Sequence, residues 1–268
     1  MLVLDGVGYR YAGSARPVLH DVHLTLGNGD IVGLVGANES GKSTLCLVAS
    51  GLAPGSIRGE LTGRLTIDGL DMAGKPVHEF ATRVGIVFQN PATQLSGVSG
   101  SVFEEVALGP MNLGLPARET VGRVRAALAI LDIDHLAERD PRRLSGGQAQ
   151  LVVIASILAM RPSHLVLDEP TSQLDPDGTR LVGRALRDLA ATGAAMLVVE
   201  HKTDLIEELC ARVAVIGAGR IVLDGPTASV LADPRLDGWG VEPPSGIRLV
   251  RAIEERGLDA GAVRAALA

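Results

Sequence analysis

Residues 36–44 carry the pattern that points most directly to chemistry. They fit the spacing G-x-x-x-x-G-K-[ST]. An apolar, β-branched run over 31–35 precedes them and a candidate helix over 43–51 follows, which is the context that this pattern requires. The glycines let backbone N–H groups surround phosphate oxygens, and the N-terminus of a helix favours anions. The segment predicts a phosphate-binding loop formed by Gly36, Ala37, Asn38, Glu39, Ser40, Gly41, Lys42, Ser43 and Thr44.

Two side chains within this loop have the chemistry that a nucleoside triphosphate requires. Lys42 places a positive charge where it can reach the β- and γ-phosphates, and the hydroxyl of Ser43 can bind Mg²⁺. Lysine is rare in this chain, which has only Lys42, Lys75 and Lys202 among its 25 basic residues, so a chance match is a poor explanation. These features indicate a P-loop nucleoside triphosphatase and leave the nucleotide open.

A second segment supplies two adjacent carboxylates at the end of an apolar run. Asp168 and Glu169 follow the run 164–167 and precede Pro170. In a protein with a phosphate-binding loop, the aspartate at such a strand end holds Mg²⁺, and the next carboxylate can orient or deprotonate an attacking water molecule. Without the loop, the same residues would fit an acidic surface turn. With it, they predict the machinery for phosphate-anhydride hydrolysis.

Three further polar elements have weaker individual signals. Residues 144–148, Leu-Ser-Gly-Gly-Gln, precede a long apolar helical run. The Ser145 hydroxyl and the glycine N–H groups could form a second anion site there, although an ordinary helix cap fits the same residues. Gln89 ends the apolar run 84–88, and His201 ends another. Each of these two fits a structural polar residue at a strand end equally well.

The composition of the 268-residue chain excludes several classes of protein. A net charge of −6 and only six aromatic residues disfavour binding of nucleic acid by bulk charge or base stacking. Two widely spaced cysteines, Cys46 and Cys210, exclude a disulfide scaffold or a cysteine-rich zinc site. There is no secretory signal and no apolar run near the roughly 20 residues that span a bilayer. We therefore expect a soluble intracellular protein that reaches a membrane only through a partner.

Short apolar runs alternate with helical patterns along most of the chain. The strands expected to be buried on both faces are 31–35, 84–88, 165–167 and 196–200. The helices expected from apolar spacing are 118–131, 148–160, 176–191 and 204–211. This alternation predicts an α/β fold with a mostly parallel sheet. The tail after 226 predicts a small appendage with a short amphipathic helix near 246–256.

In their order along the chain, these elements resemble the ATP-binding cassette (ABC) family of P-loop ATPases. The resemblance covers about residues 1–225 and rests on the phosphate loop, Gln89, the segment 144–148, the two carboxylates, the turn 172–175 and His201. It implies a RecA-like core with a mostly parallel sheet, an N-terminal antiparallel β subdomain and an inserted α-helical subdomain at about 91–160. Residues 226–268 then form a small C-terminal extension.

The resemblance also implies a role for each matching residue. ATP would be held by the phosphate loop, with Tyr11 or Tyr9 stacked on its adenine. Mg²⁺ would be bound by Ser43, Gln89 and Asp168. The catalytic residues would be Lys42, Glu169 and His201.

A sandwich dimer is implied as well, with ATP between the subunits. The residues that would face ATP held by the other subunit are Ser145, Gly146, Gly147 and Gln148, and Asp175 would communicate across the dimer. A membrane subunit would contact a groove near Gln89 and residues 91–115. Closing and opening of the dimer would move that subunit through this contact.

A closer resemblance is to the ATPase subunits of energy-coupling-factor importers, which take up vitamins or transition-metal ions such as cobalt and nickel. It rests on residues 89–94, on 102–115 and on the tail segments 241–244 and 255–258. It implies as partners a second, identical or related, ABC ATPase subunit, a membrane-embedded coupling subunit and a substrate-binding membrane subunit, with no nucleic acid. The chain would then lie at the cytoplasmic face of the cell membrane.

Three positions depart from the family pattern. Glu39 stands where most members have glycine, Leu151 replaces a basic residue, and Gln173 replaces a small one. A carboxylate at position 39, beside bound phosphates, could weaken nucleotide binding, although the general loop pattern leaves this position free. Leu151 and Gln173 remove no predicted ligand of phosphate, metal or water. Two alternative functions stay open, namely a soluble ABC ATPase that is not coupled to transport and a low-activity partner in an asymmetric ATPase pair.

Overall fold

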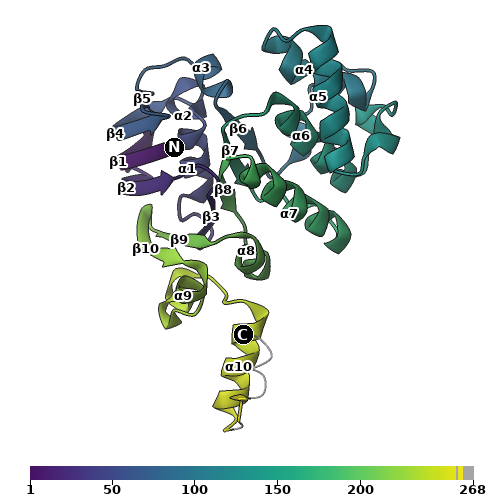
Figure 1. The fold of residues 1–268 in the computed structure, drawn as a ribbon. Helices are drawn as coiled ribbons and strands as arrows, with labels where there is room; N and C mark the ends of the chain where they lie inside the picture. Colours follow the sequence, from purple (N-terminus) through teal and green to yellow (C-terminus); the bar gives the residue numbers. More distant parts are fainter. Residues whose placement is uncertain (258, 262–268) are drawn as a thin grey trace.

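The N-terminal part of the chain forms an antiparallel sheet (Figure 1). The computed structural model describes residues 1–257 and 259–261. The sheet has the strand order β2-β1-β4-β5, and its strands are β1 (Leu2–Tyr11), β2 (Leu19–Leu26), β4 (Gly59–Ile67) and β5 (Leu70–Asp71). Side chains along β2 alternate between buried and exposed positions over much of its length, as expected of a sheet with one covered face.

A second, six-stranded sheet has the order β10-β9-β3-β8-β7-β6. Its strands are β3 (Ile31–Val35), β6 (Val84–Val87), β7 (His164–Asp168), β8 (Ala195–Val199), β9 (Arg212–Gly217) and β10 (Arg220–Pro226). All its pairings are parallel except that of β10 with β9, which form an antiparallel hairpin. Every residue of β3, β7 and β8 is buried. The mostly parallel sheet is thus confirmed.

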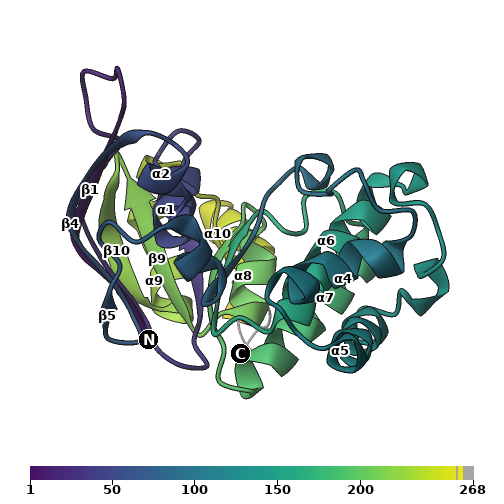
Figure 2. The same ribbon diagram turned by 90° about the horizontal axis from the view of Figure 1, so that it is seen from above.

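Two hydrophobic clusters cover the two faces of the parallel sheet. On one face, helix α1 (Lys42–Ala49) shares a cluster with both sheets, which includes Leu45 of α1, Leu4 of β1 and Leu197 of β8. The other face is covered by helices, with Val153 and Val182 in the same cluster as Leu165. Figure 2 shows these helices on the side of the molecule away from β1 and β4. Two short helices, α2 (Leu52–Gly55) and α3 (Val77–Ala81), complete the N-terminal half.

The chain between β6 and β7 is entirely helical or irregular. Its elements are η1 (Pro91–Thr93), α4 (Val102–Asn112), α5 (Ala117–Ile130), η2 (Asp134–Leu136), η3 (Pro141–Arg143) and α6 (Gly146–Met160). Helix α5 buries Val124, Ala127 and Leu128, which share one face of the helix. Helix α6 is apolar almost all round because it lies between its neighbours and the sheet.

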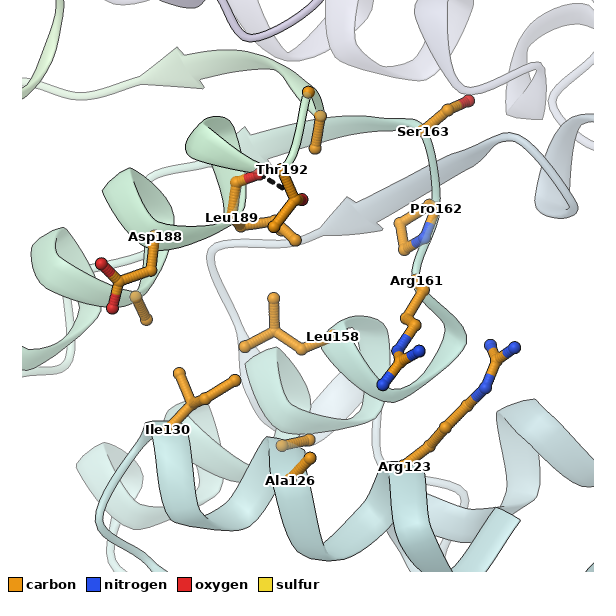
Figure 3. A pocket seen from close by; sticks show the side chains of 14 residues that line it. Arg123, Ala126, Ile130, Leu158, Arg161, Pro162, Ser163, Asp188, Leu189 and Thr192 are labelled. Atoms are coloured by element: carbon orange, nitrogen blue, oxygen red, sulfur yellow. Dashed lines mark hydrogen bonds between the residues drawn. The ribbon is translucent and has the colours of Figure 1, made fainter. Parts of the chain in front are cut away.

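A cavity of about 650 Å³ lies where this helical insertion meets the rest of the molecule (Figure 3). Ile130 of α5, Leu158 of α6 and Leu189 of α7 (Pro176–Ala191) line its apolar part. Arg123 and Arg161 line it too, and Nη1 of Arg123 donates to the Met160 carbonyl at 3.2 Å. The insertion therefore contacts the core through incomplete packing at this place.

The C-terminal elements are α8 (Thr203–Leu209), α9 (Thr227–Leu231), η4 (Pro234–Trp239) and α10 (Ser245–Glu255), and Figure 1 shows α10 reaching away from the sheets. Of these elements, α8, α9 and η4 bury side chains in the core, whereas α10 buries none. The start of α10 is tied to α8, because the backbone N and the hydroxyl of Ser245 both donate to Asp204 Oδ1, at 2.8 and 2.6 Å. Leu258, within the tail segment that suggested the importer subgroup, lies outside the described residues.

The described part of the chain contains no helix that combines the length and the apolar character needed to cross a membrane.

Leu128 tests whether the helical insertion depends on its own core. Leu128→Ala removes a side chain that is 2% exposed, so we expect the free energy of unfolding to fall by about 2–5 kcal/mol. Ile130→Ala, on the same helix at 47% exposure, should cost less than about 1 kcal/mol. Urea unfolding of both variants measures the difference, and equal losses would contradict the packing described here.

Candidate nucleotide site

The site lies at the carboxyl edge of the parallel sheet. The phosphate loop follows β3, Gln89 lies two residues beyond β6, Asp168 ends β7, and His201 lies two residues beyond β8. Because parallel strands end at the same edge, the sheet collects these four segments from distant parts of the chain. The sequence-predicted residues of the phosphate, metal and water sites are therefore brought to one edge.

The phosphate loop owes its shape to close backbone contacts. A Cβ atom at Gly36 would lie 2.3 Å from the Ile216 carbonyl oxygen, so no other residue fits there without a shift. Gly41 precedes helix α1 with a φ of 109°, in the left-handed region. Glu39 also has a left-handed φ of 61°, which explains why glycine suits this position, and its side chain is exposed. The carboxylate at the unusual position is thus exposed to solvent.

Lys42 is buried at the base of the loop. Its Nζ donates to the carbonyls of Gly36 at 2.8 Å and Ala37 at 2.7 Å. Burial lowers the pKa of Lys42, while the negative charges of Glu169 and Asp168 act in the opposite direction. The ammonium group is therefore held next to the loop, where phosphate oxygens would be stronger acceptors than the two carbonyls.

Asp168 and Ser43 provide oxygen atoms for a metal ion. Burial raises the pKa of Asp168, and its hydrogen bond with the Ser43 hydroxyl opposes this effect. No cluster of three or more His, Cys, Asp or Glu side chains among the described residues could hold a metal by itself. Mg²⁺ commonly binds one or two protein oxygens and completes its shell with phosphates and water, so this sparse oxygen set fits Mg²⁺.

The carboxylate of Glu169 is held from two sides. Gln89 Nε2 donates to Glu169 Oε2 at 2.6 Å, and His201 Nε2 lies 3.0 Å from Glu169 Oε1. The Glu169 backbone has a φ of 52°, and its N–H donates to the Val199 carbonyl at 2.9 Å. A side chain fixed in this way, and still 17% exposed, can accept a proton from a water molecule that enters the site.

The segment expected to form a second anion site lies on the helical insertion. Ser145 caps α6, because its Oγ accepts from the Gln148 N–H at 3.3 Å while Gln148 Oε1 accepts from the Ser145 N–H at 3.1 Å. Asp175 caps α7 by accepting from the Gly178 N–H at 2.7 Å. No hydrogen bond or ion pair described in the structure joins residues 145–148 to the chain's own phosphate loop. Ser145 and Gly146 are exposed.

The two candidate tyrosines occupy different environments. Tyr9 is 1% exposed, and its hydroxyl donates to the Ile57 carbonyl at 2.7 Å. Tyr11 is partly exposed, and its hydroxyl lies 2.9 Å from Thr44 Oγ1 in the phosphate loop. Only Tyr11 of the two presents an accessible ring beside the loop.

One contact of the loop has no signal in the sequence. The Ala37 N–H donates to the Trp239 carbonyl at 3.0 Å, and a Cβ atom on Gly240 would lie 2.9 Å from the Ala37 side chain. The C-terminal segment, which the sequence suggested to be an appendage, therefore packs against the phosphate loop. A hydrogen bond to a backbone carbonyl requires no particular residue type, so it leaves no pattern in the sequence. The one unusual residue at this contact is Trp239, the single tryptophan of the chain.

Residues 19–172, more than half of the chain, match the sequence profile of the family described as "ABC transporter". The chain belongs to the ABC transporter family. This confirms the family that the order of the motifs suggested, together with the P-loop α/β fold with its antiparallel N-terminal sheet. The ABC protein is an ATP-binding subunit and an ATPase.

Individual relatives are similar to this ABC protein over most of its length. It is 38% identical to the "Energy-coupling factor transporter ATP-binding protein EcfA" of Methanosarcina acetivorans, over 96% of this chain and 91% of the relative. Among solved structures it is similar to cbiO1 from Clostridium perfringens, part of the ABC transporter complex cbiONQ, with a TM-score of 0.75, 29% identity, and coverage of 95% and 94% of the two chains. The ATP-binding cassette MJ0796, a dimer bound to ADP and Pi, gives a TM-score of 0.75 at 25% identity, with 85% and 99% covered.

Gly240 tests the contact between the C-terminal segment and the phosphate loop. Gly240→Ala places a Cβ atom against Ala37 at a left-handed φ of 66°, so we expect the Kd for ATP to rise about 3- to 10-fold as the loop shifts. Gly238→Ala is the matched control, because a Cβ atom there meets nothing within 4 Å. Titration of both variants with a fluorescent ATP analogue measures the effect, and an unchanged Kd for Gly240→Ala would contradict the contact.

Proposed function

We propose that this ABC ATPase powers a membrane importer of the energy-coupling-factor type, which takes up a vitamin or a transition-metal ion. The observation that carries its catalytic part is the Glu169 carboxylate, held by Gln89 and His201 at the same sheet edge as Lys42 and Asp168. The likeness to EcfA over nearly the whole chain supports the importer class.

In the proposed mechanism, the chain's residues bind ATP and activate water. The loop N–H groups and Lys42 hold the β- and γ-phosphates, and Tyr11 stacks on the adenine. Ser43, Asp168 and Gln89 would hold Mg²⁺, which supplies positive charge next to the phosphates. Gln89 donates to Glu169 through Nε2, which leaves its Oε1 as the metal ligand. Glu169 then removes the proton of the attacking water, and His201 contacts the γ-phosphate.

We further propose that two such subunits, identical or related, close around ATP. The segment formed by Ser145, Gly146, Gly147 and Gln148 would complete the site of the other subunit, with Asp175 communicating across the interface. Support comes from the exposure of Ser145 and from its lack of a described bond to the chain's own loop. The dimeric cassette bound to ADP and Pi gives a precedent for this arrangement.

The same proposal places the subunit at the cytoplasmic face of the membrane. It would bind a membrane-embedded coupling subunit, which works with a substrate-binding membrane subunit and needs no nucleic acid. Val98 and Met111, at 82% and 60% exposure, leave apolar side chains uncovered in the region between Gln89 and residue 115. We assign the docking of the coupling subunit to this region.

We also propose bounds for the parts of the chain. The ATPase domain spans 1–225, with its helical subdomain at about 91–160, and 226–268 form the extension.

Glu169 tests the proposed catalytic site. Glu169→Gln keeps the shape of the side chain but removes its basicity, so we expect ATP turnover to fall roughly 10²–10⁴-fold while ATP still binds. Phosphate release and ATP titration measure the two properties. Glu208→Gln, which also removes one negative charge but lies on the surface of α8, should keep normal turnover. Near-normal hydrolysis by Glu169→Gln would reject the assigned role.

Ser145 tests the second anion site and the dimer. Ser145→Arg puts a bulky side chain where the other subunit's ATP would lie, so we expect hydrolysis to be lost while the monomer still binds ATP. Ser101→Arg removes a Ser cap of the same capping-box type from α4 and should leave hydrolysis intact. Sedimentation of the Glu169→Gln protein with ATP should show a dimer that the Ser145→Arg change abolishes. A fully active Ser145→Arg protein would count against the site.

The transport function is tested by its partners. Purification of the tagged chain from its native membranes should recover a coupling subunit together with a small membrane protein that binds substrate. Recovery of ribosomes or DNA instead would overturn the importer function while leaving the ATPase chemistry in place.

A further inference from the structure

A buried carboxylate next to the site has no role in the chemistry described so far. Glu200 directly precedes His201 and is 3% exposed. Burial of a carboxylate away from water is costly unless hydrogen bonds compensate it. Its Oε1 accepts two, from the Thr171 hydroxyl at 2.6 Å and from the Thr171 backbone N–H at 3.1 Å. Thr171 is itself 1% exposed, so this pair is shielded from solvent on both sides.

The Glu200–Thr171 pair connects the segments that follow β7 and β8, beyond the last backbone hydrogen bond between these two strands. The ladder of β7 and β8 reaches Asp168 opposite Val199, and the last backbone bond runs from the Glu169 N–H to the Val199 carbonyl. Beyond this point Glu169 turns into the left-handed region and the two main chains part. The side chain of Glu200 bridges the gap to Thr171. Lys202 adds a weaker tie, because its Nζ donates to the Thr171 carbonyl at 3.2 Å.

The Glu200–Thr171 hydrogen bonds lie close in sequence to Glu169 and to His201. Glu169 lies two residues before Thr171, and His201 follows Glu200, while His201 Nε2 and Glu169 Oε1 lie 3.0 Å apart. With Pro170 between Glu169 and Thr171, these residues form a closed circuit of covalent links, the Glu200–Thr171 hydrogen bonds and the His201–Glu169 contact. A change in the Glu200–Thr171 distance would move both Glu169 and His201, whereas the phosphate loop after β3 takes no part in the circuit.

We propose that Glu200 is a positioning residue, which acts through Thr171 to fix Glu169 relative to the attacking water. This inference rests on the proposed role of Glu169. Small misplacements of a catalytic group reduce the rate of the chemical step more than they reduce binding of the substrate. Substitution of Glu200 should therefore lower kcat and leave the KM for ATP nearly unchanged.

The test compares two substitutions of nearly equal size. Glu200→Met removes the acceptor but fills the space, so kcat should fall about 10- to 100-fold with the KM for ATP within about 3-fold. Glu200→Gln keeps Oε1 as an acceptor for both Thr171 donors and should retain kcat within about 5-fold. Thr171→Ser, which keeps the hydroxyl, should likewise exceed Thr171→Val in kcat.

Thr227 controls for a merely structural effect. Its hydroxyl is also buried and donates to a carbonyl, that of Cys210, at 2.5 Å, but it lies outside the circuit. Thr227→Val should destabilise the protein in thermal unfolding and leave kcat unchanged. If Thr227→Val lowers kcat as much as Thr171→Val does, the effect is one of general stability and the positioning role is rejected.

A double variant separates this inference from the proposed function. If Glu200 acts through Glu169, adding Glu200→Met to Glu169→Gln should lower kcat by less than about 3-fold, because the positioned group is already missing. A full additional loss would show that Glu200 acts elsewhere and would overturn the inference. Normal activity of Glu200→Met beside an inactive Glu169→Gln would also overturn it, and would leave the proposed function standing. Normal activity of Glu169→Gln itself would instead reject the proposed function, and with it the premise of this inference.

Discussion

The hydrogen-bond ladder of the parallel sheet is the constraint on which the nucleotide site depends. Ile31 lies opposite Met196, and Asp168 lies opposite Val199, so β3, β7 and β8 end at a common edge. The ladder brings Lys42 to the two carboxylates although well over 100 residues separate them in sequence. The side-chain bonds around Glu169 then have only to set orientations, because the backbone already fixes the positions of the segments.

The site contains a buried basic group, Lys42, and a buried acidic group, Asp168. This arrangement suits a ligand that carries both negative and positive charge. Burial lowers the pKa of Lys42 and raises that of Asp168, so for both groups desolvation outweighs the attraction between them. A phosphate would favour the charged form of the lysine, and a divalent cation would favour that of the aspartate. Binding of a metal–nucleotide complex thus relieves the cost of burying both charges, whereas either component alone relieves only part of it.

One chain places the phosphate loop and the Glu169 carboxylate at the same edge of the sheet, whereas the segment 145–148 lies on the helical insertion. The capping box of Ser145 and Gln148 satisfies N–H groups at the first turn of α6 within the segment itself, and Ser145 and Gly146 are exposed. Because Ser145 and Gly146 face solvent, a second subunit can reach this segment without rearrangement of the helical insertion.

The sequence by itself determined the phosphate loop, the pair Asp168-Glu169 and the mostly parallel sheet, because each depends on residues that are close together and on the periodicity of apolar side chains. Only the tertiary structure decided which tyrosine is the more exposed, since Tyr9 is buried in a cluster of side chains from distant parts of the chain and bonds to the Ile57 carbonyl. It alone joined Trp239 to Ala37 and Glu200 to Thr171. Such contacts link distant segments through backbone groups or single side chains, and no local pattern of residue types encodes them.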